Sequence, residues 1–155
     1  MPTHACSPRR LAVLLTLLLA LFGSLSLTSA RPAEATTLGS HAVTIASYQK
    51  GDPYLWGAAG PDKFDCSGLT KYVYGRLGKY LPHNSAMQYS TSYVTHIGKS
   101  YKQPGDLIFL KNSSGSIYHV GVYAGYGRWW VAAHTGDVVK LQTIYTTSYV
   151  VGRVK

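Results

Sequence analysis

The spacing of apolar residues changes near the middle of the chain, and this change constrains the fold more than any other feature. From Ser40 to Tyr48, apolar residues recur at the three- and four-residue spacing of an amphipathic helix. A second helix is predicted from about Cys66 to Leu77, where apolar residues form one stripe and Gly78 follows as a stop signal. After Pro104, apolar residues come in short β-rich runs separated by turn sequences. Helices followed by a strand meander predict an α+β fold, with the helices packed on a small antiparallel β-sheet.

Turn-forming residues divide the second half of the chain into predicted strands. Gly125-Tyr126-Gly127 is expected to join two of these strands as a hairpin. The strands are expected at residues 107–110, 117–124, 129–134 and 149–154. In the first half, residues 36–39 are expected to form a short leader, residues 51–61 an ordered loop, and residues 85–89 a short helix or turn. The sequence shows no internal repeat, low-complexity tract or second domain.

The first 30 residues have the layout of a secretory signal peptide. Arg9 and Arg10 precede an apolar run at residues 11–22, which small residues follow. This run is shorter than the ~20 apolar residues that cross a bilayer. We therefore predict export and cleavage, with no stable membrane insertion afterwards. Cleavage after Ala30 or after Ala35 fits the small-x-small rule. The mature part is predicted to be one domain, residues 36–155, that is secreted or held in the cell wall.

The mature part is expected to remain basic. Cleavage after Ala30 removes Arg9 and Arg10 and leaves 13 basic and 6 acidic residues, a net charge of +7. A surface of this kind favours anionic partners. Because the lysines are scattered singly, we do not expect nucleic acid as the partner. An anionic cell-wall polymer suits an exported protein better, and we expect a monomer.

Cysteine usage points to one thiol. Cys6 lies in the predicted signal peptide, so the mature chain keeps only Cys66. An unpaired cysteine in an exported protein indicates intermolecular pairing or a reactive thiol, and a buried inert thiol is the alternative. Cys66 stands at the predicted start of a helix, where Asp65 can act as the cap. Unpaired amides at such an end stabilise a thiolate, so we expect a lowered thiol pKa.

Two histidines are candidate partners for that thiol. A nucleophilic cysteine needs a base close by. His119 and His134 fall in adjacent predicted strands, and a hairpin can place two such side chains side by side, although each could equally be a structural histidine. Three other histidines, at positions 41, 83 and 96, have the neighbours of surface helix or loop residues. The histidines lack zinc-binding spacings such as H-E-x-x-H, so neither a metal nor another cofactor is predicted.

Several separated motifs occur in one order along the chain. They are Pro53-Tyr54-Leu55-Trp56-Gly57, Phe64-Asp65-Cys66-Ser67-Gly68-Leu69, the stretch from Leu81 to Gln88, the stretch from Pro104 to Phe109, His119-Val120-Gly121-Val122-Tyr123, and Ala133-His134. This series resembles the NlpC-type cell-wall endopeptidases, a branch of the papain-like cysteine peptidases. The likeness covers residues 40–154, nearly the whole mature chain.

The resemblance implies a role for each matching position. Cys66 would be the nucleophile, His119 the general base and acid, and His134 the residue that orients His119. Tyr54 and the backbone amide of Cys66 would stabilise the oxyanion. The remaining matches, Asp65, Ser67 and Ser85, would belong to the substrate pocket. Structural roles compete with these: Asp65 and Ser85 could each cap a helix, and Tyr54 could serve packing.

The resemblance also implies a reaction, the hydrolysis of an amide in the stem peptide of peptidoglycan. In this family the bond typically joins the side-chain carboxyl of D-glutamate to the diamino acid at position three. Many relatives have arginine where this chain has His83, which puts recognition of a substrate carboxylate there in doubt. Three alternatives stay open: an acyltransferase or transpeptidase with the same Cys-His pair, a wall-binding module with an inactive site, and an antibacterial toxin.

Overall fold

The computed structural model describes residues 31–155, with side chains from residue 37 onward. The predicted signal peptide, residues 1–30, lies outside the described residues, and its assignment stays a prediction. The described residues form one compact unit. Within this unit, every helix is too short or too polar to span a bilayer.

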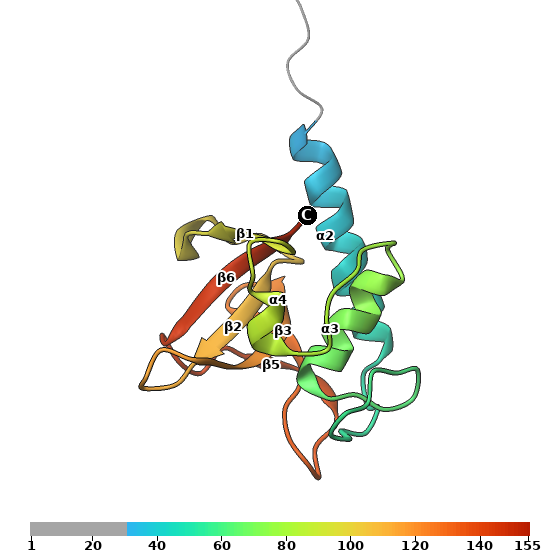
Figure 1. The fold of residues 1–155 in the computed structure, drawn as a ribbon. Coiled ribbons are helices and arrows are strands. Elements are labelled where there is room, and N and C mark those ends of the chain that lie inside the picture. The colour runs from blue at the N-terminus through green and yellow to red at the C-terminus, as the bar shows by residue number, and fades with distance from the viewer. Residues whose placement is uncertain (1–30) are drawn as a thin grey trace, which may run out of the picture. The chain divides into compact units, whose positions relative to one another are not determined.

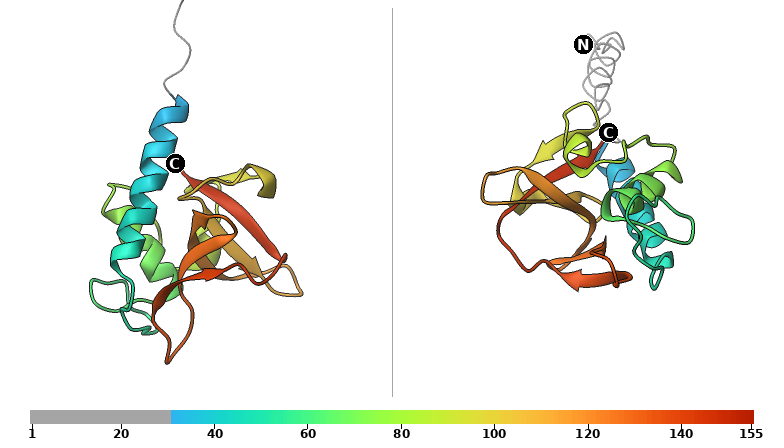
Figure 2. Two further views of the ribbon diagram at one scale, coloured as in Figure 1. Left: turned by 180° about the vertical axis from the view of Figure 1, so that it is seen from behind. Right: turned by 60° about the horizontal axis from the view of Figure 1, so that its bottom comes forward.

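Helices come first and a sheet follows, as the change in spacing predicts. The helices and strands are α2 (Arg31–Tyr48), α3 (Cys66–Gly75), α4 (Ser85–Gln88), β1 (Val94–Ile97), the 3-10 helix η2 (Lys99–Tyr101), β2 (Leu107–Lys111), β3 (Ile117–Gly125), β4 (Arg128–Ala132), β5 (Val139–Thr143) and β6 (Tyr149–Val154). The strands form one sheet in the order β1-β6-β2-β3-β4-β5, and every pair in it is antiparallel. Figures 1 and 2 show α2 and α3 side by side against the sheet. The predicted α+β fold is confirmed.

The core lies between the helices and the sheet. Ala42 of α2 and Leu69 of α3 pack with Phe109 of β2 and Val122 of β3, and all four side chains are fully buried. A second, smaller cluster includes Ile108 of β2 and lies on the opposite face of the sheet. A strand with both faces covered has an unbroken apolar sequence. This explains why residues 107–110 do not alternate between apolar and polar.

The hairpin prediction is confirmed in detail. Gly125, Tyr126 and Gly127 connect β3 to β4 with φ angles of 94°, 51° and 70°. Only glycine adopts positive φ at little cost, which accounts for the two glycines that flank the tyrosine. The turn fixes the register of β3 against β4, and β3 carries His119.

Several predicted bounds are wrong. The stretch at residues 36–39 is part of α2 and not a leader, and α3 ends at Gly75, before Leu77. The predicted strand 129–134 ends at Ala132. Strands β1 and β5 were not predicted, because polar side chains interrupt their short apolar pattern. Backbone pairing with neighbouring strands holds both segments in the sheet.

Candidate active site

The loop before α3 is folded onto the start of that helix, and this arrangement places Cys66. Oδ1 of Asp65 accepts a hydrogen bond from the backbone amide of Gly68, so Asp65 is the N-cap, as predicted. Its Oδ2 accepts from the amide of Gly57 at 2.9 Å. In turn, the amide of Asp65 donates to the carbonyl of Ala58 at 2.8 Å. The cap therefore joins the loop and the helix into one support for the cysteine.

Cys66 is a free, partly buried thiol whose pKa differs from the prediction. Burial, and after it the negative charge of Asp65, raise the pKa of the thiol to about 11. Backbone amides, that of Val120 first among them, act in the opposite direction but are outweighed. The expectation that the helix end lowers the thiol pKa is wrong for this site. At neutral pH the sulfur is protonated.

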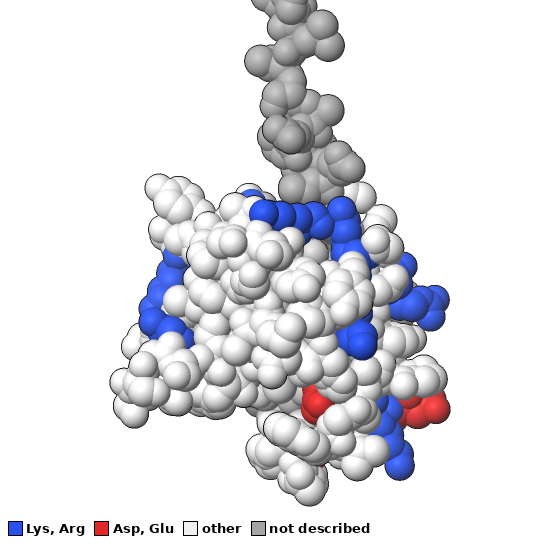
Figure 3. Space-filling model, in the orientation of Figure 1, with Lys and Arg blue, Asp and Glu red and all other residues white. Residues whose placement is uncertain are grey.

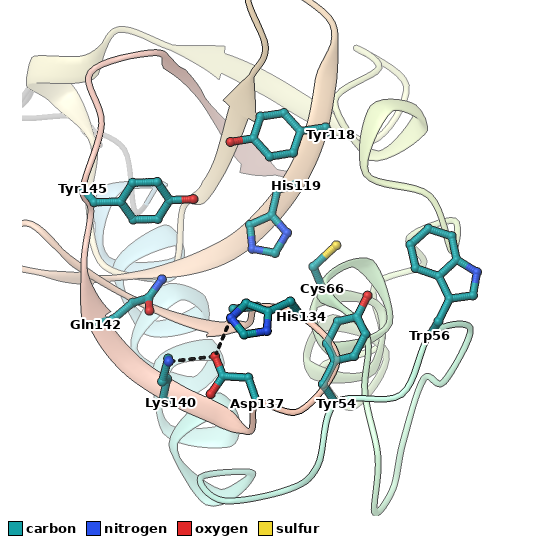
Figure 4. A pocket seen from close by; sticks show the side chains of 11 residues that line it. Tyr54, Trp56, Cys66, Tyr118, His119, His134, Asp137, Lys140, Gln142 and Tyr145 are labelled. Carbon is teal, nitrogen blue, oxygen red and sulfur yellow. Dashed lines mark ion pairs between the residues drawn. The ribbon is translucent and has the colours of Figure 1, made fainter.

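His119 stands on β3, the strand against which α3 packs. Its side chain is buried, and its ring forms a T-shaped pair with the ring of Trp129, with the centroids 5.5 Å apart. Burial lowers the pKa of His119 to about 4, which outweighs the opposing effect of Asp65. The imidazole is therefore neutral at pH 7 and can accept a proton. Cys66 and His119 line the same cavity, of about 440 Å³, and Figure 4 shows their side chains facing each other.

His134 lines this cavity but does not lie in a strand. It follows β4 in a bend, and its side chain is 75% exposed. Its Nδ1 lies 2.9 Å from the carbonyl oxygen of Thr135, and its Nε2 lies 3.8 Å from Oδ2 of Asp137. Within residues 37–155, its ring makes no hydrogen bond to His119, although its electrostatic interaction with His119 helps to lower the pKa of His119. The structure brings His134 to the site without the predicted orienting contact.

Tyr54 lies on the other side of Cys66. It lines the cavity, and its hydroxyl points toward the sulfur in Figure 4. Partial burial raises the pKa of Tyr54, and the neighbouring Cys66 and Asp65 raise it further. The phenol therefore stays protonated at neutral pH and is available as a hydrogen-bond donor.

A second cavity of about 200 Å³ adjoins the first and shares Trp56, Cys66 and Tyr118 with it. It is lined further by Asp65, Ser67, His83 and Ser85 among others. Cys66 therefore stands where the two cavities meet.

The predicted pocket residues Asp65, Ser67 and Ser85 all line the second cavity. Their polar groups differ in whether they already hydrogen-bond to other parts of the protein. Ser67 is buried and its hydroxyl donates to Oδ1 of Asp65 at 3.1 Å. Ser85 lines the second cavity, while Asn84, and not Ser85, caps α4. His83 is not a mere surface residue, because its Nε2 lies 2.8 Å from Oδ2 of Asp65.

A buried glutamine ties the wall of the second cavity to α3. Gln88 has no exposed surface; its amide nitrogen donates to the carbonyls of Ser67 and Pro82, and its oxygen accepts from Thr70. Because all three bonds are satisfied in the core, Gln88 fixes the segment that carries His83 and Ser85.

Sequence reasoning missed several residues that line the first cavity. These are Tyr118, Asp137, Lys140, Gln142 and Tyr145. Asp137, Lys140 and Gln142 lie on or beside the unpredicted strand β5. The alternation of Val139, Lys140, Leu141 and Gln142 was the available signal, since it is typical of a strand with one buried face.

Comparison with known proteins supports this description. The sequence model of the NlpC/P60 family matches residues 51–153. The chain is 44% identical over 107 residues to the probable endopeptidase p60 of Listeria monocytogenes, covering 68% of this chain and 21% of that protein. It spans 15% to 21% of the length of the Listeria p60 proteins that it matches.

Solved structures have the same fold. The NlpC/p60 domain of the peptidoglycan hydrolase SagA is 34% identical with a TM-score of 0.66, over 74% of this chain and 97% of that domain. RipD of Mycobacterium tuberculosis is 26% identical with a TM-score of 0.65, over 76% of this chain and 98% of that structure. RipD is described as a non-catalytic NlpC/p60 domain protein adapted to peptidoglycan binding. The predicted papain-like arrangement is thus shared with these proteins, and membership of the fold alone does not decide activity.

Proposed function

The chain belongs to the NlpC/P60 family, and on this premise we propose that it is a secreted cysteine peptidase of the cell wall. Its substrate would be the stem peptide of peptidoglycan, with cleavage between D-glutamate, linked through its side-chain carboxyl, and the following diamino acid. The single observation that carries the proposal is the meeting of Cys66 and a neutral, buried His119 in one cavity.

The resting pair, a thiol and a neutral imidazole, determines the first step. With a thiol pKa of about 11 and an imidazole pKa of about 4, the uncharged pair prevails over the ion pair at neutral pH. His119 therefore takes the proton of Cys66 as the sulfur attacks the amide carbonyl. The tetrahedral oxyanion that forms would accept hydrogen bonds from the hydroxyl of Tyr54 and the amide of Cys66.

The remaining steps use the proton that His119 now holds. His119 transfers it to the leaving amine, and the carbon–nitrogen bond breaks to leave a thioester on Cys66. Water then attacks the thioester with His119 as base, releasing the carboxylate product and the thiol. For His134 to orient His119 in this sequence, its ring must turn from the carbonyl of Thr135.

The basic surface supports wall polymers as a second partner. Asp65 and Asp106 are buried, and Asp106 is paired with Arg153 at 2.7 Å, so these two carboxylates add little negative charge to the surface. Figure 3 shows lysines and arginines at separate places around the visible face and few acidic groups. Binding to purified sacculi that does not change with salt would refute an electrostatic contribution.

A wall-binding module without catalysis is the second candidate. The likeness to RipD and the high pKa of the Cys66 thiol favour it. In this case the two adjoining cavities would bind stem peptides and leave them intact.

Digestion of defined stem peptides and sacculi, followed by mass spectrometry, separates the two functions. Wild-type protein is expected to release the two halves of the peptide, whereas Cys66→Ala and His119→Ala proteins fold and release none. His41→Ala is the control, because His41 is an exposed residue of α2 outside both cavities. Intact peptides with wild-type protein would favour the binding module, and substantial turnover by Cys66→Ala would refute the assignment of the nucleophile.

A further inference from the structure

Two side chains of β5 line the larger cavity and take no part in the mechanism above. Lys140 and Gln142 are two residues apart on this strand, so they project from the same face. Both line the cavity that contains Cys66 and His119, and Figure 4 shows them on the side of His119 and His134, away from Trp56.

Lys140 is held in place by its neighbour. Its Nζ lies 2.7 Å from Oδ2 of Asp137. Burial opposes ionisation of Asp137, but the neighbouring ammonium group of Lys140 and the hydrogen bond from the amide of Val138 outweigh it, and the pKa of Asp137 is lowered. The carboxylate is thus charged at neutral pH and fixes the ammonium group at the wall of the cavity.

Exposure decides which of the two charges an incoming group meets. The side chain of Lys140 is 40% exposed, whereas that of Asp137 is 13% exposed and its Oδ2 is buried. An ammonium group has three donors, so those not directed at Asp137 remain for a ligand. Of the described residues that line either cavity, Lys140 is the only lysine or arginine.

Gln142 supplies a second, unoccupied donor. Within residues 37–155 its side-chain amide makes no hydrogen bond, and it is only partly exposed. A fixed ammonium group and a free carboxamide on one strand face suit a carboxylate, which accepts several hydrogen bonds.

The direction of the reaction indicates which part of the substrate meets these groups. His119 protonates the leaving amine, so the residue that contains this amine lies on the side of His119. This is the side of Lys140 and Gln142, whereas Ser85 lines the second cavity, which contains neither His119 nor Lys140. We propose that Lys140 and Gln142 bind a carboxylate of the residue on the amine side of the scissile bond, an inference that rests on the proposed function. In the stem peptide this is a carboxylate of the diamino acid.

Two synthetic peptides test the site. Both contain D-glutamate linked through its side-chain carboxyl to a diamino acid, and they differ only in whether the carboxyl groups of that diamino acid are free or converted to carboxamides. Affinity is measured by calorimetry with Cys66→Ala protein, so that binding is assessed without any turnover. We expect Lys140→Met to weaken binding of the free-carboxylate peptide about tenfold, the scale of one charge-assisted hydrogen bond. Binding of the carboxamide peptide should hardly change.

Controls separate recognition from a purely structural role of Lys140. Lys79→Met removes the same charge from a separate surface hollow and should alter neither affinity. If Lys140 only neutralises Asp137, its substitution changes both affinities by the same factor, which overturns the proposal. Equal binding of the two peptides before substitution overturns it as well.

Steady-state kinetics of the protein with Cys66 intact provide a second test of the carboxylate site. Lys140→Met should raise KM about tenfold for the free-carboxylate peptide and leave kcat nearly unchanged. Discrimination in binding together with a lack of cleavage would contradict the proposed peptidase function and leave the carboxylate site standing.

Discussion

Nε2 of His83 lies 2.8 Å from Oδ2 of Asp65, and the carboxylate of Asp65 already accepts hydrogen bonds from backbone amides. The same carboxylate accepts from the amides of Gly57 and Gly68 and from the hydroxyl of Ser67. Four donors therefore surround a side chain that is 8% exposed. Asp65 acts first as the structural centre of the loop and helix, and a substrate amine would have to displace His83 to reach it.

Asp65→Asn should destabilise the domain. The side-chain NH2 of asparagine is a donor. It would therefore face at least one of the groups that now donate a hydrogen bond to the carboxylate. Loss of hydrogen bonds to a charged group, including the helix cap, is expected to lower the free energy of unfolding by about 2 to 3 kcal/mol. Urea denaturation measures this change. Asp62→Asn, in the exposed part of the same loop, is the control and should change it by less than about 0.5 kcal/mol. Similar midpoints for the two variants would contradict a central role for Asp65.

The reactivity of Cys66 should rise steeply with pH. Because the thiol pKa is about 11, the thiolate fraction increases about tenfold per pH unit from 7 to 10. The rate of alkylation by iodoacetamide should follow the same slope. It is measured in Cys6→Ser protein, so that only Cys66 reacts. A plateau below pH 8 would instead indicate a preformed thiolate–imidazolium pair. In Asp65→Asn protein the rate at a given pH should be higher, since the charge of Asp65 raises the thiol pKa.

His119 should make the stability of the domain depend on pH in weak acid. Its pKa is lowered from the ordinary 6.5 to about 4, so the unfolded chain binds a proton that the folded chain refuses between these values. The free energy of unfolding therefore falls as the pH drops from 6.5 to 4, by up to about 3 kcal/mol, and the contribution is complete above 6.5. Denaturation midpoints at several pH values, compared between wild type and His119→Gln, isolate this effect. Equal slopes for the two proteins would contradict it.

The sequence was sufficient for those parts of the fold that have strong local signals. The stripe that contains Leu69 and Val73, the cap at Asp65 and the Gly-Tyr-Gly turn are all found where they were expected. Strand β5 was missed because its alternating pattern is short and half polar, whereas its register against β4 in the structure makes its strand character plain. The cavity residues Lys140 and Gln142 were missed with it.

The electrostatics of the site could not be predicted from the chain alone. Position at a helix start predicts a lowered thiol pKa, but the depth of burial and the charge of Asp65 decide the opposite outcome. Likewise, His134 has the right place in the order of motifs, yet its ring contacts Thr135 and Asp137. Both effects depend on side-chain positions that only tertiary packing determines.

Gly68 and Gly75 lie about 10 Å apart along the axis of α3. Substitution by alanine should have opposite effects on stability at these two positions. A Cβ on Gly68 would lie 2.0 Å from the carbonyl oxygen of Ala58, whereas a Cβ on Gly75 would meet no atom within 4 Å. Backbone cannot yield as a flexible side chain can, so Gly68→Ala must push α3 away from the loop. We expect a loss of about 1 to 3 kcal/mol of stability.

Gly75→Ala should instead leave stability unchanged or raise it by up to about 1 kcal/mol, the difference in helix propensity. The two variants should also differ in activity. Gly68 is two residues from Cys66, so a shift of the helix start moves the sulfur relative to His119, and misplacement of reacting groups by about 1 Å can cost roughly a hundredfold in rate. Thermal denaturation together with kcat/KM on a stem peptide measures both effects. Wild-type stability and turnover in Gly68→Ala protein would mean that the close approach of helix and loop does not position Cys66.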